Sequence, residues 1–228
     1  MSGSQGTVRN LDFSQLTYEE WLKFLFDRPI EEDVFWKEHD RYDACIVAEP
    51  AKVVGYLERL SVKHRDICAS YSGDQVNQGL WAIFSVFNLQ SYIFDVDVDL
   101  KIREHCIESM YSLFADAVIP LDLDVRHGFY WMWWDYILHE LWLSGNEEYH
   151  LTSLRPDLLQ LLEATVRTLS EILILPHRGC QWAALHGLGH SHHPQAAHMV
   201  QRYLEEHDTE LTEEDRAWVK ACRDGVVQ

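Results

Sequence analysis

Apolar residues recur along this chain at intervals of three and four positions, the spacing that places them on one face of an α-helix. Alternating apolar and polar runs, which would predict strands, are nearly absent. At Thr17 the sequence Thr-Tyr-Glu-Glu forms a capping box before an apolar stripe. Further segments with helical spacing occupy residues 31–39, 50–63, 75–90, 102–114, 125–143, 156–173, 179–190, 194–207 and 212–225. The pattern predicts an all-α chain of about nine or ten helices.

The connectors between these segments are short, and none reads as an interdomain linker. A chain of 228 residues with 47% hydrophobic content can bury one large core. We therefore expect a single helical domain over residues 1–228, with residues 1–16 as a candidate disordered segment.

Residues 183–204, AALHGLGHSHHPQAAHMVQRYL, describe two antiparallel helices. Small residues on the first helix allow a neighbour to approach closely, and Pro194 suits the first turn of the second. This unit resembles a HEAT-like repeat of the short bacterial type over residues 179–207, although histidines replace the usual turn aspartate and no second copy recurs at a fixed period. The resemblance rests on Ala183, Ala184, Leu185, Leu188, Gly189, Pro194, Ala196, Ala197, Val200 and Leu204.

The resemblance implies an α-α superhelix, that is, a degenerate solenoid whose stacked helix pairs form a recognition surface. It implies no particular chemistry.

Charge narrows the class of partner. Thirty-seven acidic residues against nineteen basic ones give a net charge of −18, distributed along the whole chain. Such a surface repels nucleic acid and anionic lipid, and it attracts basic proteins. We therefore expect a protein partner with a basic surface, no nucleic acid and no membrane.

The sequence favours a cytoplasmic location. The five cysteines are widely spaced and odd in number, which is poor support for a disulfide framework or a zinc cage. The N-terminus lacks an apolar signal region, and the longest apolar stretch is interrupted by Asp135, His139 and Glu140.

Histidines offer a candidate metal site. His186 and His190 are four apart, so both imidazoles would project from one helix face, in line with Trp182. A metalloprotease motif would need a glutamate after the first histidine, where Gly187 stands. A structural or solvated role is favoured; zinc or another divalent metal is the alternative, and no other cofactor is expected.

The segment from Tyr130 to Tyr136 is the richest in aromatic residues. Burial between helix layers is the favoured interpretation. Trp131, Trp134, Asp135 and His139 are nevertheless candidate partner or ligand contacts, and Asp135 and His139, four apart, could form an acid–base pair.

Asp95, Asp97 and Asp99 imitate the start of a calcium loop, but Leu100 stands where glycine is required and Cys106 where a glutamate belongs. We expect a solvated acidic connector. Together with Glu147 and Glu148, these carboxylates are candidates for attracting a basic partner.

The leading hypothesis is an acidic cytoplasmic scaffold, without enzymatic activity, that binds a basic protein. One version is an inhibitor or immunity protein that blocks a basic nuclease-like toxin.

The alternative is a metal-assisted hydrolase or small-molecule-binding enzyme that uses His186 and His190 with Asp135 or His139. A third is a structural subunit of an obligate assembly; the oligomeric state stays open. Phosphate-binding loops and nucleophile elbows are absent, so nucleotide-dependent catalysis is not expected.

Overall fold

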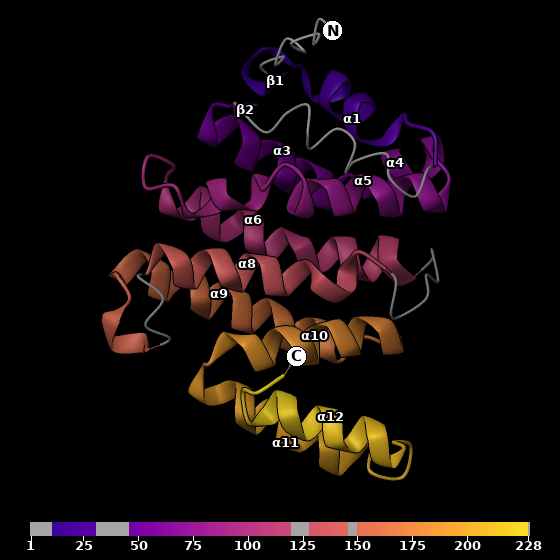
Figure 1. Ribbon diagram of the computed structural model, residues 1–228, viewed down its shortest axis with the longest axis vertical. Helices are drawn as coiled ribbons and strands as arrows, with labels where there is room; N and C mark the ends of the chain where they lie inside the picture. Colours follow the sequence, from indigo (N-terminus) through magenta and orange to yellow (C-terminus); the bar gives the residue numbers. More distant parts are fainter. Residues whose placement is uncertain (1–10, 31–45, 120–127, 146–149, 228) are drawn as a thin grey trace, which may run out of the picture.

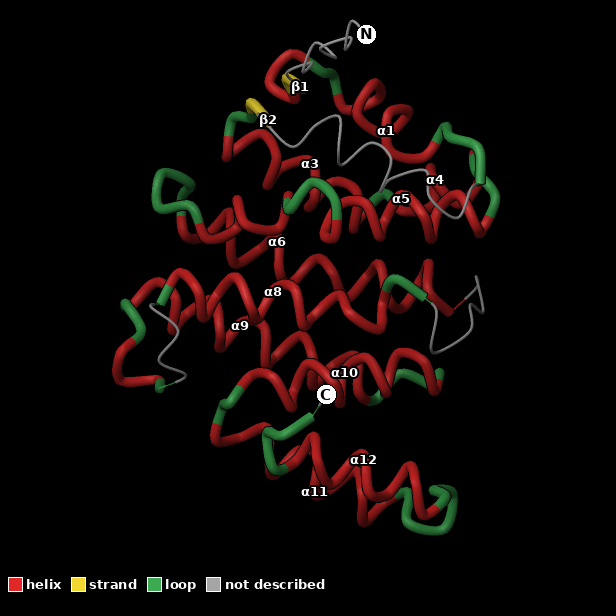
Figure 2. The backbone as a smooth tube through the Cα atoms, viewed as in Figure 1, coloured by secondary structure: helices red, strands yellow, loops and turns green. Residues whose placement is uncertain are grey.

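The computed structural model describes residues 11–30, 46–119, 128–145 and 150–227. Helices follow one another in chain order along the long axis of the molecule, from α1 at one end to α11 and α12 at the other (Figure 1). Figure 2 shows helix over most of the described backbone, with loops at the helix ends. The all-α prediction is confirmed.

Ten α-helices lie within these described residues. Their bounds are α1 Tyr18–Phe26, α3 Pro50–Val62, α4 His64–Ser70, α5 Gly73–Ser85, α6 Leu100–Leu113, α8 Tyr130–Ser144, α9 Pro156–Leu173, α10 Arg178–Ser191, α11 Pro194–Glu206 and α12 Glu213–Arg223. Short 3-10 turns occupy Phe13–Gln15, Leu89–Phe94 and Leu151–Ser153, and a π-helical turn, Phe114–Val118, continues α6.

Local chemistry explains where the helices begin. Capping boxes start α1 at Thr17, α5 at Ser72 and α12 at Thr212, where a hydroxyl accepts a backbone N–H and an acid or amide reaches back. Prolines occupy the first turn of α3, α9 and α11, where the missing N–H costs nothing. The predicted starts at Thr17 and Thr212 are confirmed.

Some boundaries differ from the prediction. The helix expected over residues 75–90 ends at Ser85, because Asn88 adopts a left-handed conformation with φ 48° and a 3-10 turn follows. Helix α4 was not predicted. The helix expected over residues 31–39 lies outside the described residues.

One small sheet accompanies the helices. Strand β1, Leu11–Asp12, pairs in parallel with β2, Ile46–Val47, with Leu11 opposite Ile46. Two residues are too few to form an alternating pattern, so neither strand could be predicted from the sequence. Within the segment considered for disorder, residues 11–15 thus form a strand and a 3-10 turn.

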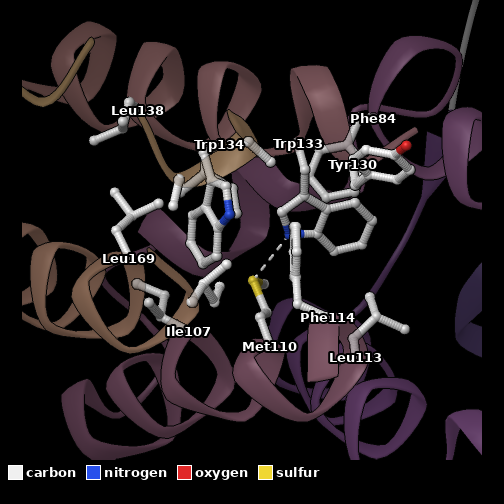
Figure 3. Close-up of a cluster of buried hydrophobic side chains, with 14 of the residues drawn as sticks. Phe84, Ile107, Met110, Leu113, Phe114, Tyr130, Trp133, Trp134, Leu138 and Leu169 are labelled. Carbon is white, nitrogen blue, oxygen red and sulfur yellow. Dashed lines mark hydrogen bonds between the residues drawn. The ribbon is translucent and has the colours of Figure 1, made fainter. Parts of the chain in front are cut away.

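Aromatic side chains fill the core between α8 and the neighbouring helices. Figure 3 shows Trp133 and Trp134 pointing from α8 toward Met110 and Ile107 of α6. The indole N–H of Trp133 donates to Met110 Sδ at 3.2 Å, and Trp134 stacks on Phe114 with ring centroids 5.8 Å apart. Trp134 is completely buried, so a partner cannot contact its indole. This corrects the expectation that Trp134 contacts a partner.

Helix α10 is the most surrounded helix of this part of the fold, since α8, α9, α11 and α12 all pack against it. Its glycines allow this. A Cβ on Gly187 would lie 2.7 Å from Trp134 Cβ, and one on Gly189 would lie 3.1 Å from Cys222 Cα. The small residues expected on this helix therefore allow two close approaches, by α8 at Gly187 and by α12 at Gly189.

None of the helices within the described residues combines the length and apolar character that crossing a membrane requires.

Candidate functional site

An aromatic column crosses three helices. Trp131 of α8, Trp182 of α10 and Trp218 of α12 lie together with His186 of α10, and we call these four residues the aromatic column. The Trp131 ring lies 4.9 Å from His186 and 5.2 Å from Trp218, and Trp182 lies 4.8 Å from Trp218. The interplanar angles are 15°, 28° and 10°, so the rings stack face to face.

The three tryptophans of the column are half-buried, whereas His186 is only 2% exposed. Neighbouring rings therefore cover part of each indole, and the ring nitrogen of Trp182 is itself buried. The strip suggested by the sequence, in which Trp182, His186 and His190 are spaced four apart, is real, but only its two ends reach the surface.

The guanidinium of Arg178 packs against one end of the column. The Arg178 guanidinium lies 5.1 Å from the centroid of the Trp182 ring, within reach of a cation–π interaction. The same guanidinium donates to Asp215 Oδ2 at 2.8 Å. Arg178 opens α10 and Asp215 stands in the first turn of α12, so this contact ties the starts of the two helices together.

Two histidines and an aspartate form the other end. His186 Nδ1 lies 3.0 Å from the carbonyl oxygen of Trp131, and a carbonyl can only accept, so Nδ1 carries the proton. Burial lowers the pKa of His186, against a smaller opposing effect of the Trp131 hydrogen bond, so the imidazole is favoured in its neutral form. Its Nε2 is then an acceptor.

His190 donates to that acceptor. Its Nε2 lies 3.2 Å from His186 Nε2 and 3.6 Å from Asp135 Oδ1. Both contacts use the same nitrogen, so Asp135, His190 and His186 form a branched cluster and no linear relay. His190 and Asp135 are each a little over a quarter exposed, which leaves this cluster accessible at the edge of the column.

The structure thus joins two of the predicted candidate sites. Asp135 meets His190 of α10, and the expected partner His139 lies exposed one turn further along α8. His186 and His190 face each other as their spacing predicted. Their nitrogens are close enough to share one metal ion, but no group of three or more His, Cys, Asp or Glu within the described parts of the chain is arranged to hold one.

The remaining turn histidines have structural partners. His192 ends α10 in a left-handed conformation with φ 50°. His193 accepts the Gln195 N–H as the N-cap of α11, and its Nε2 lies 3.2 Å from Glu163 Oε1. These contacts shape the turn between α10 and α11, as a structural role would require.

The acidic connector before α6 also has a structural role. Asp95 Oδ1 accepts the Asp97 N–H at 2.8 Å, and Asp99 Oδ1 accepts the Lys101 N–H at 2.9 Å, which caps α6. Asp97 and Asp99 are exposed and Asp95 is half-buried, so their negative charge still reaches solvent. Residues 146–149, which include Glu147 and Glu148, lie outside the described residues.

Sequence reasoning missed Trp218, Arg178 and Asp215. Only the packing of α12 against α10 brings Trp218 and Asp215 to Trp182 and Arg178. A weak signal was available: Trp218 stands one residue before Val219 and four before Cys222, so helical spacing places it beside these buried positions.

Comparison of the chain with protein-family models, with curated proteins and with solved structures found no match.

Proposed function

We propose that this protein is a helical scaffold that binds another protein through complementary charge, and that the partner has a basic surface. Thirty-seven acids and nineteen bases leave eighteen acids (37 − 19) uncompensated even if every base were paired. Some basic residues also form ion pairs within the protein: Arg167 contacts Glu104 and Glu108 at 2.9 Å, and Arg59 contacts Glu19 at 2.8 Å. A negative field of this kind attracts cationic surfaces and repels phosphate backbones.

One acidic segment carries this proposal. Residues 205–215, EEHDTELTEED, contain seven acids and form the end of α11, the connecting loop and the first turn of α12. Glu205, Glu206, Asp208, Glu210, Glu213 and Glu214 are exposed. The segment lies at the far end of the molecule from α1 (Figure 1). A basic protein would therefore meet a concentrated patch of negative charge there.

The arrangement of helices supports a recognition role. Trp131 contacts His186 and Asp135 contacts His190, so α8 and α10 run in the same direction. Arg178 contacts Asp215 and Trp182 contacts Trp218, so α10 and α12 do so as well. We propose that this stacking of parallel helices, each separated by a return helix, is a degenerate HEAT-like solenoid, an architecture that serves as an extended binding surface.

Binding to basic proteins tests this proposal. Isothermal titration of the full chain would use a basic ribonuclease and core histones, with an acidic protein of similar size as a negative control. We expect binding to a basic protein at 150 mM salt that weakens as salt rises. Inhibition of the ribonuclease would support the inhibitor version. Equal binding of basic and acidic proteins, or binding insensitive to salt, would contradict the proposal.

Two double variants of equal charge test whether the acidic segment 205–215 is the part of the surface that the partner contacts. Glu206→Gln combined with Glu210→Gln removes two exposed acids from the acidic segment, and Asp66→Asn combined with Asp74→Asn removes two from α4 and α5. Both pairs change the net charge equally. We expect only the first pair to weaken binding more than the loss of net charge explains.

A second candidate function has one specific observation in its favour. Asp135, His190 and His186 form a contiguous cluster with accessible edges, as metal-assisted or acid–base chemistry on a small molecule would need. Elemental analysis after dialysis against Zn²⁺ separates the candidates. One zinc per chain, lost in His190→Ala, would favour the enzyme; substoichiometric zinc unaffected by that change would reject its metal-dependent form.

A further inference from the structure

A small cavity lies where the ends of α9 and α11 meet the first turn of α10, and we call it the α9/α11 pocket. Its volume is about 200 Å³. Leu173 and Tyr203 are its buried lining residues, Met199 is half-buried, and Ile174 is exposed. Cavities that hold a whole drug-sized ligand start at about 300 Å³, whereas about 150 Å³ is enough for a benzene ring. The pocket therefore has room for one aliphatic or aromatic side chain.

Hydrogen-bonding groups around the pocket already have partners within the protein. The Tyr203 hydroxyl donates to Gln181 Oε1 at 3.0 Å, and Gln181 Nε2 donates to the carbonyl oxygen of Leu175 at 3.0 Å. The His207 ring stacks on Tyr203 with centroids 4.1 Å apart, and its Nδ1 donates to the Tyr203 carbonyl oxygen at 3.1 Å. Since these groups are paired, an apolar occupant leaves none of them without a partner.

Ile174 extends the apolar lining of the pocket to the surface. Its side chain is 72% exposed, the highest value among the large apolar side chains of the described residues. It follows the last residue of α9 as the C-cap of that helix. A single exposed isoleucine is ordinary, but one that lines a cavity adds to the apolar area that an inserted side chain would remove from water.

Acidic residues surround the pocket. Glu206 and His207 line it and belong to the acidic segment 205–215, so the pocket and this segment are continuous. Glu171 is exposed in the last turn of α9. The basic lining residue Arg202 lies 3.5 Å from Glu206, which offsets its charge. An apolar side chain that enters here would therefore meet the surface best when basic residues flank it.

We propose that the α9/α11 pocket receives one apolar side chain, of the size of leucine or phenylalanine, from a basic segment of the partner protein. The basic residues beside that side chain pair with the acidic segment 205–215. This inference rests on the proposed function and specifies its point of contact. Charge brings the partner to the surface, and burial of the apolar side chain selects the segment that stays bound.

Peptides of equal charge and different central residue provide the test. Each labelled heptapeptide carries three lysines, one variable residue and three further lysines, and fluorescence anisotropy measures its binding to the full chain at 50 mM salt. Charge alone predicts equal affinities. An apolar pocket predicts that the leucine and phenylalanine peptides bind about fivefold to tenfold more tightly than the alanine peptide. Equal affinities would overturn the inference.

Variants of unchanged charge assign the preference to the pocket. Ile174→Ser removes the exposed apolar lining residue, and Met199→Gln replaces an apolar lining residue with a polar one of similar length. Both should reduce the leucine preference to about twofold or less and leave binding of the alanine peptide unchanged. Val62→Ser, at an apolar residue that is 54% exposed at the end of α3, is the matched control and should keep the full preference. Circular dichroism checks that each variant keeps its helicity. A full preference in both pocket variants would overturn the inference.

Photo-cross-linking locates the side chain on the unmodified protein and does not depend on the folding of a variant. A diazirine analogue of leucine takes the variable position of the peptide, and mass spectrometry maps the cross-linked residues. We expect cross-links within residues 171–181 and 199–207 that excess unlabelled leucine peptide removes. Cross-links concentrated on other helices, or spread evenly along the chain, would overturn the inference. Dimers of the protein alone that Ile174→Ser dissociates would assign the pocket to a contact between two copies and overturn it as well.

The two proposals fail in different ways. If neither the basic proteins nor any of the peptides bind, the proposed function is wrong and the pocket assignment falls with it. If the basic proteins and all the peptides bind, but without a preference for leucine or phenylalanine, only the pocket assignment is wrong.

Discussion

Adding one methyl group at Gly187 tests the packing that holds α8 and α9 against α10. An alanine Cβ at this position would lie 2.7 Å from Trp134 Cβ and 2.9 Å from Leu169 Cδ2. Trp134 Cβ is attached to the α8 backbone and cannot rotate away, and both side chains are completely buried. The helices must therefore separate to admit the methyl group.

Two opposing effects set the magnitude. Replacing a helical glycine by alanine stabilises a helix by about 1 kcal/mol. Overpacking a well-packed core costs about 1–3 kcal/mol, and more when backbone must move. The balance at Gly187 is a loss of up to about 2 kcal/mol. Gly55 of α3 supplies the control, because its alanine Cβ would meet nothing within 4 Å, so only the gain of about 1 kcal/mol applies.

Thermal and urea unfolding, followed by circular dichroism, would compare Gly187→Ala and Gly55→Ala with the unmodified chain. For a domain of this size, 1 kcal/mol corresponds to roughly 2–4 °C in Tm. We expect Gly55→Ala to raise the Tm by about that amount and Gly187→Ala to lower it. A Gly187→Ala variant as stable as Gly55→Ala would refute the close contact between α10 and Trp134.

Two further predictions concern buried charge. Burial lowers the pKa of His186 and of His192 below the usual 6.5, so as pH falls through 6.5 the unfolded chain takes up protons that the folded chain does not, and stability falls toward acid pH. Urea midpoints at about pH 7.5 and pH 5.5 should show this loss, and His186→Asn should reduce it; an unchanged slope in that variant would contradict the assignment. Asp157→Asn leaves the Arg103 guanidinium, 4% exposed and 3.1 Å from that carboxylate, without its counter-charge, which should cost about 3 kcal/mol or more. Arg155→Ala removes only a half-exposed partner of Asp157 and should cost less than about 1 kcal/mol, so equal losses of Tm in the two variants would disprove the role of the buried pair.

The sequence predicted the helices well because their signals are local. The capping box of α1 involves only residues from Thr17 to Glu20. The end of α10 at His192, which has a left-handed backbone and precedes Pro194 by two residues, likewise depends only on nearby residues. The two-residue strands carry no periodic signal, since pairing between Leu11 and Ile46 spans 35 positions (46 − 11) and becomes visible only when the chain has folded. The sequence favoured burial of the aromatic segment of α8 but did not single out Trp134, because aromatic rings surround much of the helix and any of them could face inward.

The candidate site could be predicted only in part, because its residues come from three helices. The spacing of His186 and His190 placed their imidazoles on one face, and the structure brings them to 3.2 Å. The spacing of Asp135 and His139 suggested a pair on one helix, but the packing of α10 beside α8 gives Asp135 a partner in His190, at 3.6 Å. The packing of neighbouring helices, which the sequence does not reveal, therefore determined the partner of Asp135.

The position of Trp218 explains how α12 and the acidic turn at its start are held in place. Its indole lies 5.2 Å from Trp131 and 4.8 Å from Trp182, and those two rings are 6.4 Å apart, so the three indoles form a triangular cluster that holds α12 against α8 and α10. The acidic first turn of α12 is fixed by the same contact, because the residues from Glu213 to Asp215 precede Trp218 on one short helix. A rigid acidic turn is the pre-organisation that the proposed surface for a basic partner requires.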